Sequence, residues 1–254
     1  MPLSLISAVR VLPALVLAVC CSVTPSFSAA ATKALKFHQT HFFLGKCDMT
    51  VARDAFRMDN LGNLRFSVVA KAPDWTVTLY RDDEKIYFSE SLADLLDTGI
   101  LSEFLVVRKA RYVDPSTHRK LEVVLSGYKI VCMDASDQIL KYMPLQRAGV
   151  PSQIEKLAYG IYKMPTGGGI PISYVAAQEH KDFFVSRSKA GGRHAYFDTT
   201  KIEAVDVTPA FFDLPKGYKK AASVRAIVSG KNSMEMSEDA LQTFGRDIEP
   251  VKRK

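Results

Sequence analysis

The sequence predicts an α+β fold that is mainly β: a curved antiparallel sheet or an incompletely closed barrel, with a few helices over its mouth. The first observation is a series of short runs rich in β-branched and aromatic residues, separated by small turns such as 60–63 and 81–84. Short, closely spaced runs of this kind are typical of an antiparallel meander. The second observation is that helical spacing of apolar residues dominates in only two long stretches. We expect strands at 35–43, 46–53, 55–59, 64–70, 75–80, 85–89, 120–133 with a break at Ser126-Gly127, 138–142, 172–178, 181–188, 195–205 and 222–228.

The two stretches with helical spacing are 92–105 and 152–164. The first fits one amphipathic helix or two short helices that meet at Gly99, with Ser91 as the N-cap. In the second we expect Ser152 to be the N-cap, with Glu155 three residues later. The first stretch is interpreted either as a mobile apolar lid over a ligand cavity or as a helix packed on the sheet as ordinary core. Its periodic apolar residues are Leu92, Leu95, Leu96, Ile100, Leu101, Phe104 and Leu105.

The first thirty residues have the order of a cleaved secretory signal peptide. One charge, Arg10, is followed by an almost wholly apolar run at 11–23 and by small residues at 26–31. We therefore expect a periplasmic or secreted protein. An uncleaved anchor is the alternative, but the apolar run falls short of the roughly 20 residues that span a bilayer. Lipid modification at Cys20 is a further alternative, although Val19 is larger than the small residue that such a site requires before its cysteine.

The remaining chain is expected to form a single β-rich domain at 31–228, after the signal peptide at 1–30. A polar tail follows at 229–254, with one short helix at 237–244. The formal net charge of +7 becomes +6 when Arg10 is lost with the signal peptide. Because the basic residues are scattered, they indicate a solvated exterior, or else peripheral contact with an anionic membrane surface or an acidic partner. Nucleic acid is not an expected partner of an exported protein.

Two cysteines, Cys47 and Cys132, remain after the signal peptide. Each lies in a strand-like run, and an oxidising compartment permits a disulfide between neighbouring strands. The alternative is a pair of buried thiols. A bridge closing a loop of this length would stabilise the fold by about 4 kcal/mol.

No catalytic or metal-binding signature is found in the sequence. His38 and His41 are three residues apart in a predicted strand, so their side chains point to opposite faces, and neither a His-Glu-x-x-His nor a Cys-x-x-Cys pair occurs. A Gly-x-Ser-x-Gly elbow is also absent. The glycines at 167–169 are not followed by Lys-Ser/Thr, which indicates a flexible loop. We expect no catalytic residue, no metal and no cofactor.

Large aromatic residues populate the amino-terminal strands. A curved sheet with such a face either fills its own core or lines a cavity for an apolar ligand. Periodicity does not separate these two interpretations. The candidate residues for an apolar cavity or its lid are Phe56, Phe66, Trp75, Tyr80, Leu92, Leu96, Leu101 and Phe104.

Four segments carry a resemblance to a known family. They read AFRMDN at 55–60, KAPDWTVTLYR at 71–81, GIPISY at 169–174 and KIEAVDVTPAFFDLPKGY at 201–218. In this order, with helical interruptions between them, they resemble the periplasmic lipoprotein carriers of the LolA and LolB type over residues 33–228. The Phe-x-Leu-Pro-x-Gly-Tyr corner at 212–218 is the most telling of the four.

The resemblance implies an incompletely closed antiparallel barrel that binds lipoprotein acyl chains without covalent chemistry. It further implies that segments 92–105 and 154–161 plug the mouth of the barrel. We therefore expect an exported, non-enzymatic protein that binds a lipid or a lipoprotein acyl chain. The alternative is a structural or protein-interaction module of the cell envelope with a solid core.

Overall fold

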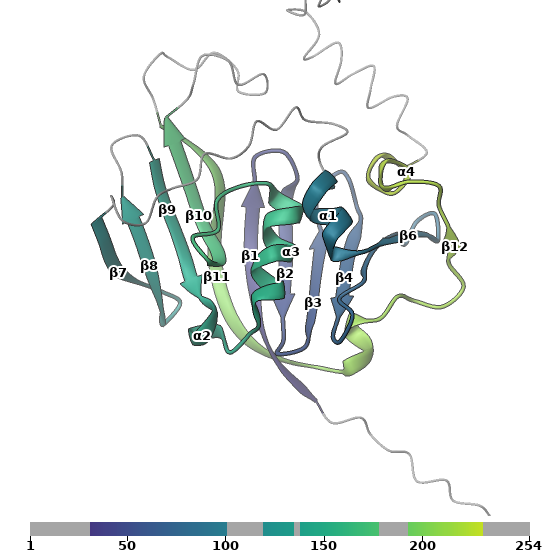
Figure 1. The fold of residues 1–254 in the computed structure, drawn as a ribbon, viewed down its shortest axis with the longest axis horizontal. Coiled ribbons are helices and arrows are strands. Elements are labelled where there is room, and N and C mark those ends of the chain that lie inside the picture. Colours follow the sequence, from purple (N-terminus) through teal and green to yellow (C-terminus); the bar gives the residue numbers. More distant parts are fainter. Residues whose placement is uncertain (1–30, 101–118, 135–137, 178–192, 231–254) are drawn as a thin grey trace, which may run out of the picture.

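A computed structural model describes residues 31–100, 119–134, 138–177 and 193–230. Within these ranges twelve strands form one large, curved and unclosed sheet that carries a few helices (Figure 1). This confirms the predicted fold class. The predicted strand at 181–188, the predicted helix at 237–244 and the predicted signal peptide at 1–30 lie outside the described residues.

The elements follow one another in a simple order along the chain. The helices are α1 (Leu92–Thr98), α2 (Leu145–Ala148), α3 (Ser152–Tyr162), the 3-10 helix η1 (Pro209–Phe212) and α4 (Val224–Ser229). The strands are β1 (Thr32–His41), β2 (Gly45–Val51), β3 (Ala55–Asn60), β4 (Ser67–Lys71), β5 (Val77–Arg81), β6 (Ile86–Glu90), β7 (Arg119–Leu125), β8 (Tyr128–Asp134), β9 (Gln138–Pro144), β10 (Gly169–Ala177), β11 (Arg193–Val207) and β12 (Lys219–Lys220).

Two antiparallel meanders are joined in the middle of the sheet by β1 and β11. The strand order is β12-β6-β5-β4-β3-β2-β1-β11-β10-β9-β8-β7. The long β11 pairs along β1 from Thr32↔Val207 to His41↔Phe197. The first strand of the chain is therefore paired with a strand from its carboxyl-terminal part. The sheet is mixed rather than purely antiparallel, because β12 runs parallel to β6.

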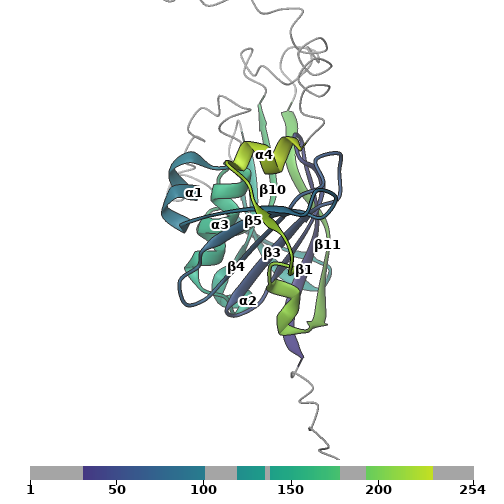
Figure 2. The ribbon, with the colours of Figure 1, turned by 90° about the vertical axis from the view of Figure 1, so that its right-hand side faces the viewer.

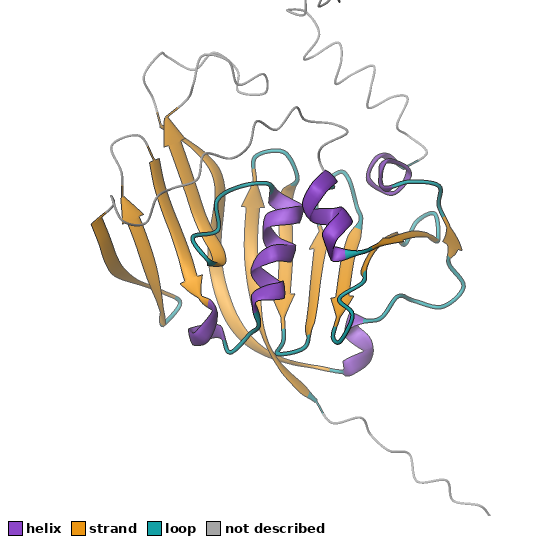
Figure 3. Ribbon diagram, viewed as in Figure 1, coloured by secondary structure: helices purple, strands orange, loops and turns teal. Residues whose placement is uncertain are grey.

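The helices α1 and α3 lie on the same face of the sheet, which we call the inner face; the opposite face is the outer face (Figures 2 and 3). Side chains alternate between the two faces along each strand. On β1 and β3 the inward residues Phe37, Phe56 and Met58 are fully buried, whereas the outward Lys36 and Arg57 are half-buried. The buried residues of the main hydrophobic cluster join the inner face to α3 and extend from β5 to β8, and half-buried residues of β6 and β7 pack against them.

The carboxyl-terminal corner packs on the outer face. Phe212 of η1 is buried against Ala34, Ala52 and Ala55. Arg57 donates from Nη1 to the Phe211 carbonyl oxygen at 2.7 Å, and its guanidinium lies 4.4 Å from the centroid of the Phe211 ring. The corner that carries the family resemblance therefore fastens the end of β11 onto β3.

Most of the predicted strand at 222–228 forms the helix α4 (Val224–Ser229) instead. The Ser223 hydroxyl accepts a hydrogen bond from the Ala226 N–H at 3.3 Å and caps α4. At the other end, the buried Arg81 donates to the Leu64 and Ile227 carbonyl oxygens at 2.6 and 3.1 Å. A cation that satisfies the last carbonyls of a helix stabilises its end, and here it also holds α4 against the turn before β4.

The two predicted N-caps have different outcomes. At α1 the prediction is confirmed: the Ser91 hydroxyl accepts from the Asp94 N–H at 3.1 Å, within a capping box. At α3 it is wrong, since Pro151 occupies the N-cap position and Ser152 is the first helical residue. Glu155 instead accepts a hydrogen bond from the Thr166 hydroxyl, which ties α3 to the loop that follows it.

Candidate apolar binding site

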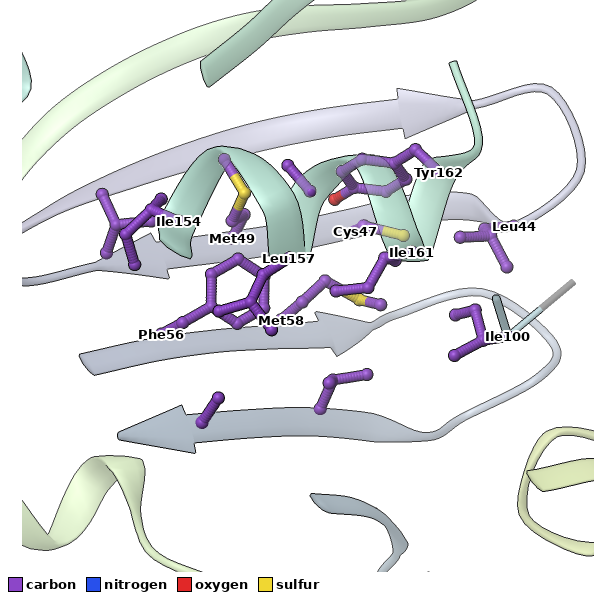
Figure 4. Packing of buried hydrophobic residues seen from close by; sticks show 14 of the residues in the cluster. Leu44, Cys47, Met49, Phe56, Met58, Ile100, Ile154, Leu157, Ile161 and Tyr162 are labelled. Atoms are coloured by element: carbon purple, nitrogen blue, oxygen red, sulfur yellow. The ribbon is translucent and has the colours of Figure 1, made fainter. Parts of the chain in front are cut away.

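The helix α3 lies across the inner face and fills its middle. Its buried residues Ile154, Leu157 and Ile161 are spaced at three and four, which puts them on one side of the helix. Figure 4 shows Leu157 directed toward the strands beside Phe56 and Met58. All of these side chains are fully buried. The middle of the inner face is therefore solid core.

The shorter helix α1 covers the inner face beside α3 and is held mainly by one side chain. Leu95 is its single fully buried residue, while Leu92 and Leu96 are half-buried. Leu95 packs against Gly160 of α3: a Cβ at Gly160 would lie 2.7 Å from Leu95 Cγ. The absence of a side chain at Gly160 thus permits the close approach of the two helices.

One lysine fixes the carboxyl end of α1. Lys163 donates from Nζ to the Leu96 carbonyl oxygen at 2.8 Å and lies 5.3 Å from the centroid of the Tyr159 ring. Burial lowers the pKa of Lys163, and the nearby Asp97 opposes this shift. The attachment of α1 to α3 therefore combines one apolar contact with one polar contact.

The structure separates the predicted ligand-binding residues into groups. Phe56, Phe66 and Trp75 belong to the solid core of the inner face. Leu92 and Leu96 lie on α1, where their side chains remain half-exposed. Leu101 and Phe104 lie outside the described residues.

Tyr80 does not belong to an inner-face site. Its ring meets Tyr218 edge-on at 5.7 Å between centroids, and the Arg57 guanidinium lies 5.9 Å from its centroid. Strand alternation explains this position, because Leu79, the residue before it, belongs to the inner cluster. Tyr80 therefore lies on the outer face, apart from the other predicted residues of the strands.

A buried polar group lies under the carboxyl end of α3. The Tyr162 hydroxyl donates to Gln39 Oε1 at 2.7 Å, and Gln39 Nε2 donates to Thr199 Oγ1 at 3.3 Å and to the Pro171 carbonyl oxygen at 3.4 Å. Gln39 continues the inward series of β1 after Phe37. This polar residue at an inward position is the signal by which sequence analysis could have found the group.

His41 is the next inward residue on β1 and is only 1% exposed. Its Nδ1 accepts from the N–H groups of Phe43 and Leu44 at 3.2 and 3.1 Å, which requires a ring protonated at Nε2 when neutral. Burial lowers the pKa of His41 to about 3, although the backbone of Tyr162 opposes the shift. Among the described residues, no acceptor lies within hydrogen-bonding distance and angle of His41 Nε2. The ring is thus held neutral by its surroundings.

His38 points to the outer face, as its spacing from His41 predicts. Its Nδ1 lies 2.8 Å from Asp48 Oδ1 and its Nε2 lies 3.0 Å from Glu203 Oε1, so one ring bridges β2, β1 and β11. Lys201 and then His38 lower the pKa of Glu203 to about 2. These contacts bind the two meanders together on the solvent side.

The predicted disulfide between Cys47 and Cys132 is absent, and both cysteines are free. Cys47 lies on β2 and Cys132 lies on β8, and four strands separate β2 from β8. Neighbouring strands are about 4.8 Å apart, so the two cysteines are too distant to form a disulfide. The pKa of the Cys47 thiol is raised to about 12, mainly because the thiol is buried. The structure therefore agrees with the alternative prediction, in which Cys47 and Cys132 are two buried thiols.

Metal ligands and membrane spans can be judged over the described part of the chain. There, no three His, Cys, Asp or Glu side chains are arranged to hold a metal ion. In the same ranges, no helix is long and apolar enough to cross a membrane.

Comparison with known proteins does not identify a family. No family model matches the chain, and no curated protein matches it. Among solved structures, it is similar to an uncharacterized conserved protein from Thermus thermophilus. That similarity has 11% sequence identity and a TM-score of 0.39, over 75% of this chain and 90% of the other.

Proposed function

We propose that the protein is an exported, non-enzymatic envelope protein that binds an apolar ligand, such as a lipid or a lipoprotein acyl chain, beneath α1. The observation that carries the proposal is the weak attachment of this helix. α1 covers an apolar sheet face, yet Leu95 is its one fully buried side chain. Displacing α1 would open the inner face while α3 stays in place.

The energies involved allow such an exchange. Exposing Leu95 costs about 2 kcal/mol, and exposing the half-buried Leu92 and Leu96 adds a similar amount. An acyl chain that takes their place gains about 0.8 kcal/mol for each methylene it buries. Roughly five buried methylenes therefore offset the displacement, which is well within the length of a common acyl chain.

The architecture supports the proposal as well. The curved, unclosed sheet with helices on its inner face is the arrangement that the resemblance to the lipoprotein carriers implies. In that resemblance, segments 92–105 and 154–161 plug the mouth of the barrel. We assign the moving part to α1, because α3 contributes several fully buried residues to the core.

Native mass spectrometry of protein purified from its own envelope tests the proposal. A co-purifying lipid mass, together with uptake of a fluorescent fatty acid, is the expected result. In the variant Leu96→Asp, uptake should fall more than stability, because Leu96 is half-buried on the displaced helix. Leu61→Asp is the matched control, since Leu61 is 59% exposed in the turn between β3 and β4. A clean apo mass without fatty acid uptake would overturn the proposal.

The second candidate function is a structural or protein-interaction module with a solid core. It is favoured by the complete burial of Phe56 and Phe66 beneath the helices. Equal losses of stability and fatty acid uptake in Leu96→Asp would identify α1 as ordinary core and favour this candidate.

A further inference from the structure

The two edges of the open sheet differ in how they are protected. At one edge, β12 has two residues, both exposed lysines, and it pairs with β6 in the parallel sense. Short, lysine-rich edge strands resist pairing with other chains. At the other edge, β7 has seven residues and pairs without a bulge along β8, from Arg119↔Asp134 to Leu125↔Tyr128.

The edge strand β7 is suited to accept a further strand. Among the described residues its neighbour in the sheet is β8 alone, so the backbone N–H and C=O groups of every second residue point away from the sheet. Leu121 is 40% exposed and Val124 is 68% exposed, two of the four exposed large hydrophobic residues in the described ranges. β7 therefore combines exposed apolar side chains with outward-pointing backbone groups that no other described strand pairs.

We propose that β7 is a self-association edge, which pairs antiparallel with β7 of a second copy of the chain about a two-fold axis at Leu121. In this register Leu121 faces Leu121 of the second copy, and Lys120 faces Glu122 in both directions. Arg119 faces Val123 in the same way. Directly opposite residues of antiparallel strands interact most strongly, so this register gains the Lys120–Glu122 charge pairs and the contact between the two Leu121 side chains.

The neighbouring registers are less favourable. A two-fold axis at Glu122 places this carboxylate opposite its own copy, which is a like-charge pair. An axis at Val123 faces Lys120 with the turn residue Ser126 and leaves the charge of Glu122 opposite Val124. Of these three registers, only the axis at Leu121 places opposite charges of β7 against each other, namely Lys120 against Glu122, while Arg119 lies opposite Val123.

The charge of Glu122 is already stabilised within one chain, which keeps it ionised for this role. Lys129 Nζ lies 3.1 Å from Glu122 Oε1, and Arg147 Nη2 lies 2.5 Å from Glu122 Oε2. Hydrogen bonds from these two cations lower the pKa of Glu122. The contact adds one strand pair, so the dimer is expected to be weak and concentration-dependent.

Sedimentation velocity or light scattering of the full chain tests the proposal through a charge swap. The wild type should form a dimer as its concentration rises. Lys120→Glu should weaken the dimer by about tenfold, because it creates two like-charge pairs. The double variant Lys120→Glu/Glu122→Lys restores opposite charges across the axis and should recover the dimer.

Two further measurements make the result decisive. Lys219→Glu on β12 is the matched control and should leave the dimer unchanged, because it alters charge at the other sheet edge. Circular dichroism of each variant reports whether the fold is kept. A wild type that stays monomeric up to its solubility limit would overturn the proposal. So would a dimer that Lys120→Glu leaves intact, or a folded double variant that fails to recover it.

Discussion

At the scale of single residues, His41 makes stability depend on pH. Its folded-state pKa of about 3 lies below the ordinary value of 6.5, so the ring takes up a proton on unfolding at any pH between these values. Its contribution to stability is therefore complete above pH 6.5 and is lost as the pH falls toward 3. Denaturant unfolding should give a free energy about 2 kcal/mol lower at about pH 5 than at about pH 7.

The variant His41→Asn isolates this effect. An asparagine oxygen can still accept from the N–H groups of Phe43 and Leu44, but it does not titrate. The variant should be less stable at neutral pH because the smaller side chain leaves a cavity, and its stability should change less over the same pH interval. Identical pH profiles of the two proteins would show that His41 is not the titrating group.

Cys47 should be unreactive in the folded protein. Burial raises its pKa to about 12, so the thiolate that reacts with alkylating agents is scarce. With iodoacetamide at mildly alkaline pH, peptide mapping should find Cys47 unmodified until denaturant is added. Rapid labelling of the native protein, or a peptide that links Cys47 to Cys132, would contradict the buried thiol.

At the scale of elements, the contact between α1 and α3 depends on Gly160. Replacing a mid-helix glycine with alanine normally stabilises a helix by about 1 kcal/mol. Here the new Cβ would meet Leu95 at 2.7 Å, and we expect Gly160→Ala to destabilise the protein by about 1–3 kcal/mol.

A double-mutant cycle with Leu95→Ala separates the clash from the helix propensity. Leu95→Ala alone should cost about 2–4 kcal/mol, because it removes the main apolar contact of α1. Combined with Gly160→Ala, it vacates the space that the new methyl group needs, so the two costs should not add. Additive costs in thermal unfolding would show that Gly160 does not limit the approach of the helices.

Local patterns predicted most elements, and the failures have identifiable causes. Ser91 marked the start of α1 in the sequence, because an N-cap depends on residues within one turn. Residues 222–228 were misjudged, since their apolar run fits a short strand as well as a short helix. The decisive contact for α4 is Arg81, which lies far away in the sequence.

The candidate site was predictable only in part for the same reason. The apolar residues of the strands could be identified from the sequence. That α3 covers Phe56 could not, because this packing depends on contacts between segments that are distant in the sequence. The sequence also does not reveal that Tyr80 lies on the outer face, because an aromatic residue fits either side of a strand. The order of the sheet, with β11 beside β1, also arises from non-local pairing.

At the scale of the whole molecule, one continuous core joins both meanders. The main cluster contains Trp75, just before β5, and Ile130 on β8, near opposite ends of the sheet. A shared core makes independent unfolding of the two halves unfavourable, so unfolding should be cooperative. The sole tryptophan, Trp75, is 6% exposed, and its fluorescence reports on the amino-terminal meander.

Ile130→Ala tests this coupling from the far side of the sheet. The variant removes a fully buried side chain and should lower the free energy of unfolding by about 2–5 kcal/mol. Because the core is continuous, Trp75 fluorescence and far-UV circular dichroism should shift together to the same lower midpoint. Val124→Ala, which changes a side chain that is 68% exposed, is the control and should leave both midpoints nearly unchanged. If Ile130→Ala moved the circular dichroism transition but not the fluorescence transition, the two meanders would unfold as separate units.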